Sequence, residues 1–184
     1  MPPKKSDKHL VWIDCEMTGL EPTRDVLLEI ATIITTYDLD IVARGPAIPI
    51  RASETRLSRM DEWNQTTHAK SGLLDRIRSE GVTVAEAERQ TLNFVKRYCY
   101  AKTAPLCGNS IGQDKRFLAK YMPSLTEYLH YKVVDVSSIK VLVSEWYAGK
   151  YTAPPKKELH RALDDIEESI AELAYYRKHV FVKK

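Results

Sequence analysis

The chain has 184 residues, of which 43% are hydrophobic and 29% are charged. This composition fits one globular domain with a core of its own. The three cysteines form no CxxC pair and leave an odd count, which argues against a disulfide framework or a zinc cage. The formal charge is only +3, and much of the excess lies in terminal lysines, so the surface suits a short anionic ligand better than a long duplex.

No apolar run approaches the roughly 20 residues that a membrane helix needs, so we expect no membrane association. The opening stretch MPPKKSDKH lacks an apolar segment of signal-peptide length, and the first strand begins near Leu10. We therefore expect a cytoplasmic protein. One domain should span residues 9–180, between a disordered basic tail at 1–8 and a short tail at 181–184.

Three β-rich segments open the chain. His9–Asp14 is a short apolar run that ends in acids, and Val26–Tyr37 is rich in β-branched residues. With Ile41–Ile50, these segments predict three consecutive antiparallel strands joined by turns.

The pattern then changes from strands to alternating helices and strands. Apolar residues three and four apart predict a helix over Thr83–Tyr100, opened by a capping box of Thr83 and Glu86. Ala104–Cys107 reads as a short buried strand, and Ser110–Met122 as the helix that follows it.

Pro123 should end that helix. Val133–Asp135 is a candidate fifth strand, which leads into a helix that runs through Trp146. A Pro- and Lys-rich stretch, Ala148–Glu158, precedes a last amphipathic helix over Ala162–His179. This order predicts an α/β fold: a mixed five-stranded sheet, its first three strands antiparallel, with helices on both faces.

Two acids end the first strand. Residues two apart on a strand point the same way, so Asp14 and Glu16 should share a face while Cys15 faces the other. Carboxylates roughly 7 Å apart along a strand can share a pair of metal ions. D-x-E alone is also typical of a solvated strand end. The apolar LVWI before it favours a buried strand whose terminal acids lie at the mouth of a cleft.

Asp114 interrupts the apolar stripe of its predicted helix. It shares a face with Phe117 and Leu118, and a buried carboxylate is costly unless it is paired or bound to metal. The alternative is an acid paired with Lys115 or Arg116.

The segment HRALDD contains a further acid and a titratable base. Five residues on a continuous helix differ by about 140° in direction, so His160 and Asp165 cannot converge if both are helical. We expect His160 on the preceding loop, where an imidazole suits a general base, and Asp165 in the first helical turn. His160 could instead be an exposed loop histidine, and Asp164 competes with Asp165 as the ligand.

Together these motifs resemble the three exonuclease motifs of the DEDD superfamily, in its histidine-bearing branch. The stretches WIDCEMTGL, MDEWN, GNSIGQDKRFL and HRALDDIEESIAELAYYR are similar to the oligoribonuclease family in particular, from about Leu10 to His179. The resemblance implies a ribonuclease H-like fold, a homodimer, and cleavage of short single-stranded RNAs of about 2–5 nucleotides, dinucleotides especially. The products would be 5′-mononucleotides released from the 3′ end, and duplex DNA would not be a partner.

The resemblance also assigns the catalytic residues. It makes His160 the base and implies two divalent ions, Mg²⁺ or Mn²⁺, in each active site. The ligands of these ions would be Asp14, Glu16, Asp114 and Asp165.

The residues that follow the metal strand should contact the terminal nucleotide. Met17, Thr18 and Gly19 come directly after Glu16, so their backbone can approach the substrate, and Gly19 lacks a Cβ that would obstruct it.

Other matches imply contacts to the bases and to the 5′ phosphate. Leu20, Trp63 and His68 match positions that sandwich bases, although Trp63 could equally be a core residue. Tyr131 matches an aromatic residue from the partner subunit. A cap for the 5′ phosphate would comprise Ser110, Tyr131, Lys132 and Ser137. Lys132 stands where many family members carry arginine, which would change the shape of the cap.

Two alternatives use the same sequence differently. One is a related 3′ exonuclease that acts on longer RNA or single-stranded DNA, which the modest charge argues against. The other is a non-catalytic domain, which would be expected to lack one of the carboxylates.

Overall fold

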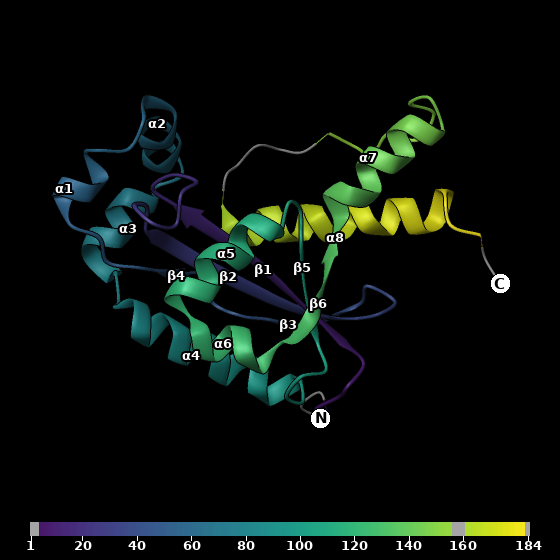
Figure 1. Cartoon of the computed structure of the whole chain (residues 1–184), viewed down its shortest axis with the longest axis horizontal. Coiled ribbons are helices and arrows are strands. Elements are labelled where there is room, and N and C mark those ends of the chain that lie inside the picture. The colour runs from purple at the N-terminus through teal and green to yellow at the C-terminus, as the bar shows by residue number, and fades with distance from the viewer. Residues whose placement is uncertain (1–3, 156–160, 183–184) are drawn as a thin grey trace.

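The computed structural model describes residues 4–155 and 161–182. Its sheet has the strand order β3, β2, β1, β5, β6, with β4 beside β2. The strands span His9–Met17 (β1), Leu27–Thr36 (β2), Ile41–Arg44 (β3), Ile48–Pro49 (β4), Pro105–Gly108 (β5) and His130–Asp135 (β6). β2 is antiparallel to β1, β3 and β4, whereas β5 is parallel to β1 and β6. The predicted mixed α/β sheet is confirmed, and β4 extends it (Figure 1).

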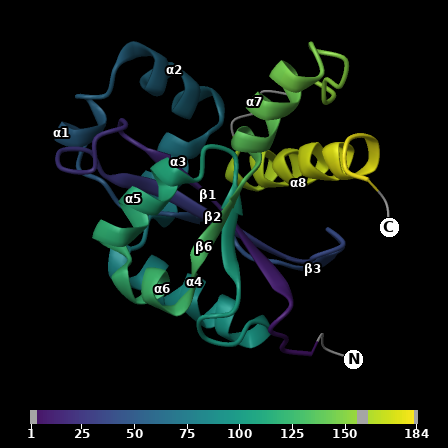
Figure 2. The ribbon, with the colours of Figure 1, turned by 45° about the vertical axis from the view of Figure 1, so that its right-hand side comes forward.

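Helices cover both faces of this sheet (Figures 1 and 2). Within the described residues they span Glu54–Leu57 (α1), Glu62–Lys70 (α2), Leu73–Glu80 (α3), Val84–Tyr98 (α4), Gly112–Tyr121 (α5), Pro123–Tyr128 (α6), Val136–Trp146 (α7) and Ala162–His179 (α8). No helix of the described chain is long and apolar enough to cross a membrane.

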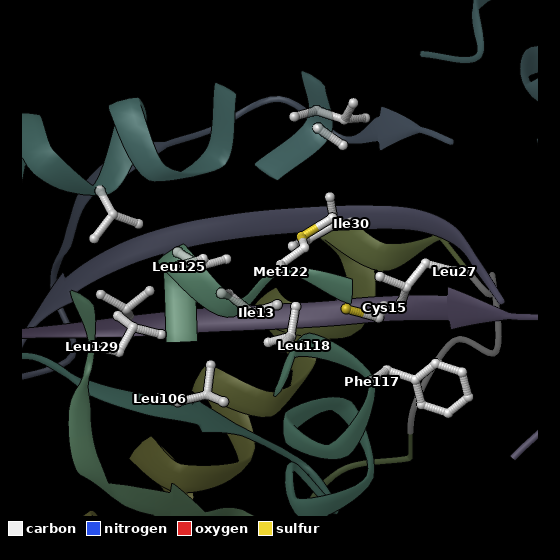
Figure 3. Packing of buried hydrophobic residues seen from close by; sticks show 14 of the residues in the cluster. Ile13, Cys15, Leu27, Ile30, Leu106, Phe117, Leu118, Met122, Leu125 and Leu129 are labelled. Carbon is white, nitrogen blue, oxygen red and sulfur yellow. The ribbon is translucent and has the colours of Figure 1, made fainter. Parts of the chain in front are cut away.

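The side chains of β1 divide between two cores because successive residues point to opposite faces. Val11 and Ile13 join a cluster that α4, α5 and α6 cover. Figure 3 shows part of this cluster, with Leu118 of α5 and Leu125 of α6 over the strand. Trp12 lies in the second core, under α7 and α8. The sheet therefore carries α8 on the face that the even-numbered residues of β1 occupy.

The predicted single strand over Ile41–Ile50 is two strands in the structure. β3 pairs with one end of β2 and β4 with the other. Gly45 and Pro46 lie between them. Gly45 still donates its N–H to the carbonyl oxygen of Thr32 in β2 at 2.8 Å, but Pro46 has no N–H to donate to a ladder. The chain therefore leaves the sheet between β3 and β4.

The first three helices fill a region for which the sequence analysis predicted substrate contacts but no helix or strand. α2 opens at Asp61, whose side chain accepts a hydrogen bond from the Asn64 N–H at 2.8 Å. The sequence of α2, EWNQTTHAK, is almost entirely polar, so it has no apolar stripe that would reveal a helix. A separate small core holds this region together, formed by Leu28, Leu57, Met60, Leu73 and Ile77.

Two predicted helix ends differ in detail. Thr83 caps α4 by accepting from the Glu86 N–H at 3.2 Å, as expected. In a full capping box the Glu86 carboxylate would accept a hydrogen bond from the Thr83 N–H. In the structure it binds Arg89 instead. Pro123 follows the end of α5 and also begins α6, because a proline is well accommodated at a first helical position.

Candidate active site

Three carboxylates from distant parts of the chain meet at the C-terminal half of β1. Asp14 and Glu16 lie on β1, Asp165 lies in the first turn of α8, and one oxygen of each is within 4.8 Å of the others. Carboxylate oxygens at this spacing are donors that Mg²⁺ and Mn²⁺ prefer. The donor set therefore fits a divalent cation, and it contains Asp165 in place of the neighbouring Asp164.

The alternation of β1 explains how these groups meet. Trp12 points into the core beneath α8, and Asp14 and Glu16 are the next positions on the same face of the strand. Ile166 of α8 is buried in that core, which brings the first turn of the helix, and Asp165 with it, onto the end of the strand. Acids are also favourable in a first helical turn, where backbone N–H groups are exposed.

Asp114 reaches the same strand from α5. It is 7% exposed, and its Oδ1 accepts a hydrogen bond from the Cys15 N–H at 3.0 Å. The two neighbouring cations bind other groups: Lys115 donates to the carbonyl oxygen of Tyr131, and Arg116 contacts the loop after β1. A backbone amide, between the two acids of β1, therefore holds Asp114.

Burial and repulsion from neighbouring acids raise the pKa of two of these acids, Glu16 and Asp114. Burial raises the pKa of Glu16 to about 8, and the charge of Asp165 is the next largest cause. Burial also raises the pKa of Asp114 to about 7, although its backbone hydrogen bond opposes the shift. Cations favour the charged form of a carboxylate, so metal binding here would release protons.

His68 packs against the same end of β1. It is 1% exposed, with Nε2 3.1 Å from the carbonyl oxygen of Met17 and Nδ1 3.8 Å from Oε2 of Glu16. Glu29 lies opposite Glu16 in the β1–β2 pairing and is bound by Arg76. The structure thus places His68 beside a predicted metal ligand.

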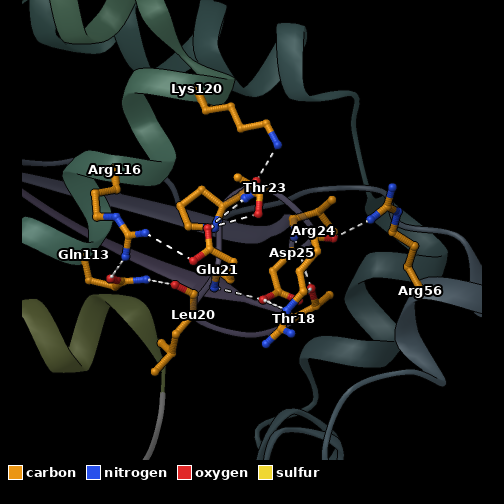
Figure 4. A network of polar contacts seen from close by, with 12 residues as sticks. Thr18, Leu20, Glu21, Thr23, Arg24, Asp25, Arg56, Gln113, Arg116 and Lys120 are labelled. Atoms are coloured by element: carbon orange, nitrogen blue, oxygen red, sulfur yellow. Dashed lines mark hydrogen bonds and ion pairs between the residues drawn. The ribbon is translucent and has the colours of Figure 1, made fainter.

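The loop after β1 is closed by Asp25, a residue that the sequence did not single out (Figure 4). Thr18 Oγ1 donates to Asp25 Oδ1 at 3.4 Å, and the Glu21 N–H donates to Asp25 Oδ2 at 2.9 Å. A Cβ on Gly19 would lie 2.6 Å from this carboxylate. The sequence suggested that Gly19 leaves room for a nucleotide, but in the structure its close neighbour is Asp25.

Three large apolar side chains with predicted substrate roles are strongly exposed. Leu20, in the loop after β1, is 71% exposed, Trp63 of α2 is 62% exposed, and Tyr131 of β6 is 76% exposed. Trp63 is therefore not a core residue.

Ser110, between β5 and α5, lies against Ser137 in the first turn of α7. The Ser110 N–H donates to Asp135 Oδ1 at 3.0 Å and to Ser137 Oγ at 2.9 Å, and the two hydroxyl oxygens lie 3.1 Å apart. Tyr131 and Lys132 lie on β6, the strand that ends at Asp135. The Lys132 Nζ lies 5.8 Å from the centre of the Tyr131 ring.

Asn109 links this serine pair to α8. Its Nδ2 donates to Ser169 Oγ at 3.0 Å and to Glu172 Oε2 at 3.1 Å, and its Oδ1 accepts from Ser137 Oγ at 3.3 Å. Ser169 Oγ in turn donates to the carbonyl oxygen of Asp165 at 2.8 Å. All the partners of Asn109 are distant in sequence, so sequence reasoning had no local signal for them.

His160, the predicted base, lies outside the described residues. The described chain resumes at Arg161, directly before α8 and four residues before Asp165.

Comparison with known proteins identifies the family. The sequence model of the family described as Exonuclease matches residues 11–173. The chain is 49% identical over 178 residues to an oligoribonuclease of Klebsiella pneumoniae, covering 97% of this chain and 98% of that protein. It is 51% identical over 176 residues to an oligoribonuclease of Aeromonas hydrophila, with 96% and 97% coverage.

Solved structures with a similar fold include exonuclease I enzymes. One, from Escherichia coli in complex with a 5cy-dT13 oligonucleotide, aligns with a TM-score of 0.74 at 12% identity, and another, from Methylocaldum szegediense, with 0.69 at 15%. The alignments cover 95% and 94% of this chain but only 42% and 41% of those chains. The shared fold agrees with the near full-length sequence match, and the chain therefore belongs to the oligoribonuclease family, 3′-to-5′ exoribonucleases that carry the exonuclease domain.

Proposed function

We propose that this protein hydrolyses short single-stranded oligoribonucleotides, especially dinucleotides, from the 3′ end to 5′-mononucleotides. The observation that carries the proposal is the convergence of Asp14, Glu16 and Asp165 within 4.8 Å. Asp114 approaches the same strand from α5. These four acids would hold two divalent ions, Mg²⁺ or Mn²⁺, which activate water and stabilise the leaving 3′ oxygen when bound.

The proposed base is His160. An imidazole with a pKa near 6.5 can accept a proton from the attacking water at neutral pH. Arg161, the residue after it, comes directly before α8, whose first turn carries Asp165. This connection supports a base delivered beside the carboxylates.

Contacts to the bases would come from Leu20, Trp63 and His68, next to the backbone of Met17, Thr18 and Gly19. The exposure of Leu20 and Trp63 supports this role, because stacking needs an accessible apolar surface and tolerates any base. His68 is buried, so it would contact a base only through the edge of its ring, or it would act indirectly by holding the Glu16 carboxylate in place.

A cap for the 5′ phosphate would use Ser110 and Ser137, whose hydroxyls lie side by side, together with Lys132. A third nucleotide would displace the phosphate from these donors, so the cap favours dinucleotides. Tyr131 would act on the active site of a partner subunit. Further exposed apolar residues on β6 and α7 suit the interface of a homodimer: Val133, Val141, Leu142 and Trp146. We place this homodimer in the cytoplasm.

A length series tests the proposal. Purified protein is incubated with RNAs from two to twenty nucleotides in Mg²⁺, Mn²⁺ or EDTA, and 5′-mononucleotide release is measured. We expect the highest kcat/KM on the dinucleotide and no turnover in EDTA. A preference for the twenty-mer, or for single-stranded DNA, would instead support an exonuclease for long strands.

A further inference from the structure

The loop after β1 presents Leu20, one of the proposed base contacts, to solvent. Leu20 is 71% exposed, and a free loop would let such a side chain sample many positions. Ordering it against a base would then reduce the affinity for substrate. The backbone around Leu20, however, is held from two sides.

On one side, hydrogen bonds between Glu21 and Asp25, here called the clasp, close the loop. The Glu21 N–H donates to the Asp25 carboxylate, and the Asp25 N–H donates back to the Glu21 carbonyl oxygen at 2.8 Å. The carboxylate also lies so close to Gly19 that a Cβ there would force it to move. This clasp closes the loop on itself but does not fix where the loop lies relative to the metal ligands.

The other side is α5, and Gln113 makes that connection. Its Nε2 donates to the Leu20 carbonyl oxygen, while its Oε1 accepts from Arg116 Nη1 at 2.9 Å. Arg116 also contacts Glu21 Oε2 at 3.5 Å. Because a guanidinium only donates and a carbonyl oxygen only accepts, these two partners select a single orientation of the Gln113 amide.

Gln113 directly precedes Asp114, which binds the Cys15 N–H between the two acids of β1. Neighbouring residues of one helix thus hold the acid site and the backbone of the exposed leucine. Figure 4 shows Gln113 and Arg116 reaching the loop together, with the Leu20 side chain extending away from them.

We propose that Gln113 is a positioning residue, which sets Leu20 at a fixed place relative to the carboxylate site so that the base of the bound nucleotide meets a preorganised apolar surface. The inference rests on the proposed function, in which Leu20 contacts a base. Gln113 itself touches no substrate. It acts through the Leu20 backbone, so its loss should weaken substrate binding more than it slows the chemical step.

A double-mutant cycle tests this role. Gln113→Met keeps the length of the side chain but removes the amide donor, and Leu20→Ala removes the apolar surface. Gln90→Met is the matched control, because the Gln90 amide also makes a side-chain hydrogen bond, to Glu86 on α4, away from the site. KM and kcat on a dinucleotide are measured for each variant, and thermal unfolding verifies that each one folds.

We expect Gln113→Met to raise KM about 2- to 10-fold, the range that one hydrogen bond commonly supplies, with kcat changed less than about 2-fold. In the Leu20→Ala background the same substitution should have no further effect on KM, and Gln90→Met should resemble the wild type. An equal rise of KM in both backgrounds, or an unchanged KM in Gln113→Met when Leu20→Ala raises it, would overturn the inference. Failure of Leu20→Ala to change KM would reject the base contact and the inference with it, whereas a wild type inactive on short RNA would reject the proposed function itself.

Discussion

The stability of the metal-free protein should depend on pH because of Glu16. Burial and neighbouring acids raise its pKa from 4.5 to about 8. Between these values the folded state binds more protons at Glu16 than the unfolded state does, so the free energy of unfolding falls as pH rises. The contribution is fully present below pH 4.5 and is lost as pH rises toward 8.

The size of this effect follows from the shift. One pKa unit corresponds to about 1.4 kcal/mol, so the ceiling for Glu16 is on the order of 4–5 kcal/mol. The Glu16 side chain is 18% exposed, and screening by water makes the fall in the free energy of unfolding smaller than that ceiling. Since about 1 kcal/mol shifts the Tm of a chain of this size by roughly 2–4 °C, we expect a fall of several degrees between pH 5.5 and 8.5.

Divalent cations should offset the loss of stability at high pH. They bind the deprotonated acids, so the rise in Tm produced by Mg²⁺ or Mn²⁺ should be larger at pH 8 than at pH 6. Thermal unfolding is followed by circular dichroism in EDTA and then in excess metal. Glu16→Gln should reduce the metal-free pH dependence and leave the part that comes from Asp114, whose pKa is raised to about 7. Glu86→Gln, at a partly exposed acid whose pKa is lowered to about 2 by Arg89, should leave it unchanged in this range. A metal-free Tm that stays constant from pH 5.5 to 8.5, or an equal effect of metal at both pH values, would refute the reasoning.

Three further outcomes concern catalysis. Asp114→Asn should lower kcat by several orders of magnitude while circular dichroism shows an intact fold, because the amide keeps an acceptor for the Cys15 N–H but loses the charge; full activity would remove Asp114 from the site. His160→Ala should flatten the acidic limb of the pH–rate profile, and an unchanged limb near neutral pH would assign the proton transfer elsewhere. Lys132 is exposed in the described structure; if bound substrate buries its phosphate contact, Lys132→Ala should weaken binding of a 5′-phosphorylated dinucleotide by about 1–3 kcal/mol and of longer RNA much less. Calorimetry measures both, and equal losses at all lengths would exclude the cap.

Local patterns in the sequence were enough for the sheet and for the main helices. The apolar run before Asp14 and the spacing of apolar residues in α4 and α8 reflect periods of two and 3.6 residues, which act within a few neighbours along the chain. The polar helix α2 has no such period, so it could not be predicted in this way. Pro46 after Gly45 was a visible signal for the break between β3 and β4, and the apolar pattern of Ile41–Ile50 concealed it.

The order of the acidic motifs likewise pointed to a metal-dependent nuclease, because carboxylates at the ends of apolar segments need a cation or a partner. Which acid joins the cluster was a different matter. Asp164 and Asp165 have the same side chain, so the residue type does not distinguish them. Ile166 packs into the core between α8 and the sheet, and this orientation of the helix directs Asp165 toward Asp14.

Tertiary structure alone decided the contacts that brace the site. Gln113 meets Leu20 across 93 positions of the chain, and Asn109 meets Ser169 across 60. Such pairs have no period or spacing that a sequence displays, because their distance depends on how α5 and α8 pack against the two faces of one sheet. Local sequence motifs identify the residue types of the site, whereas the packing of the helices on the sheet determines their geometry.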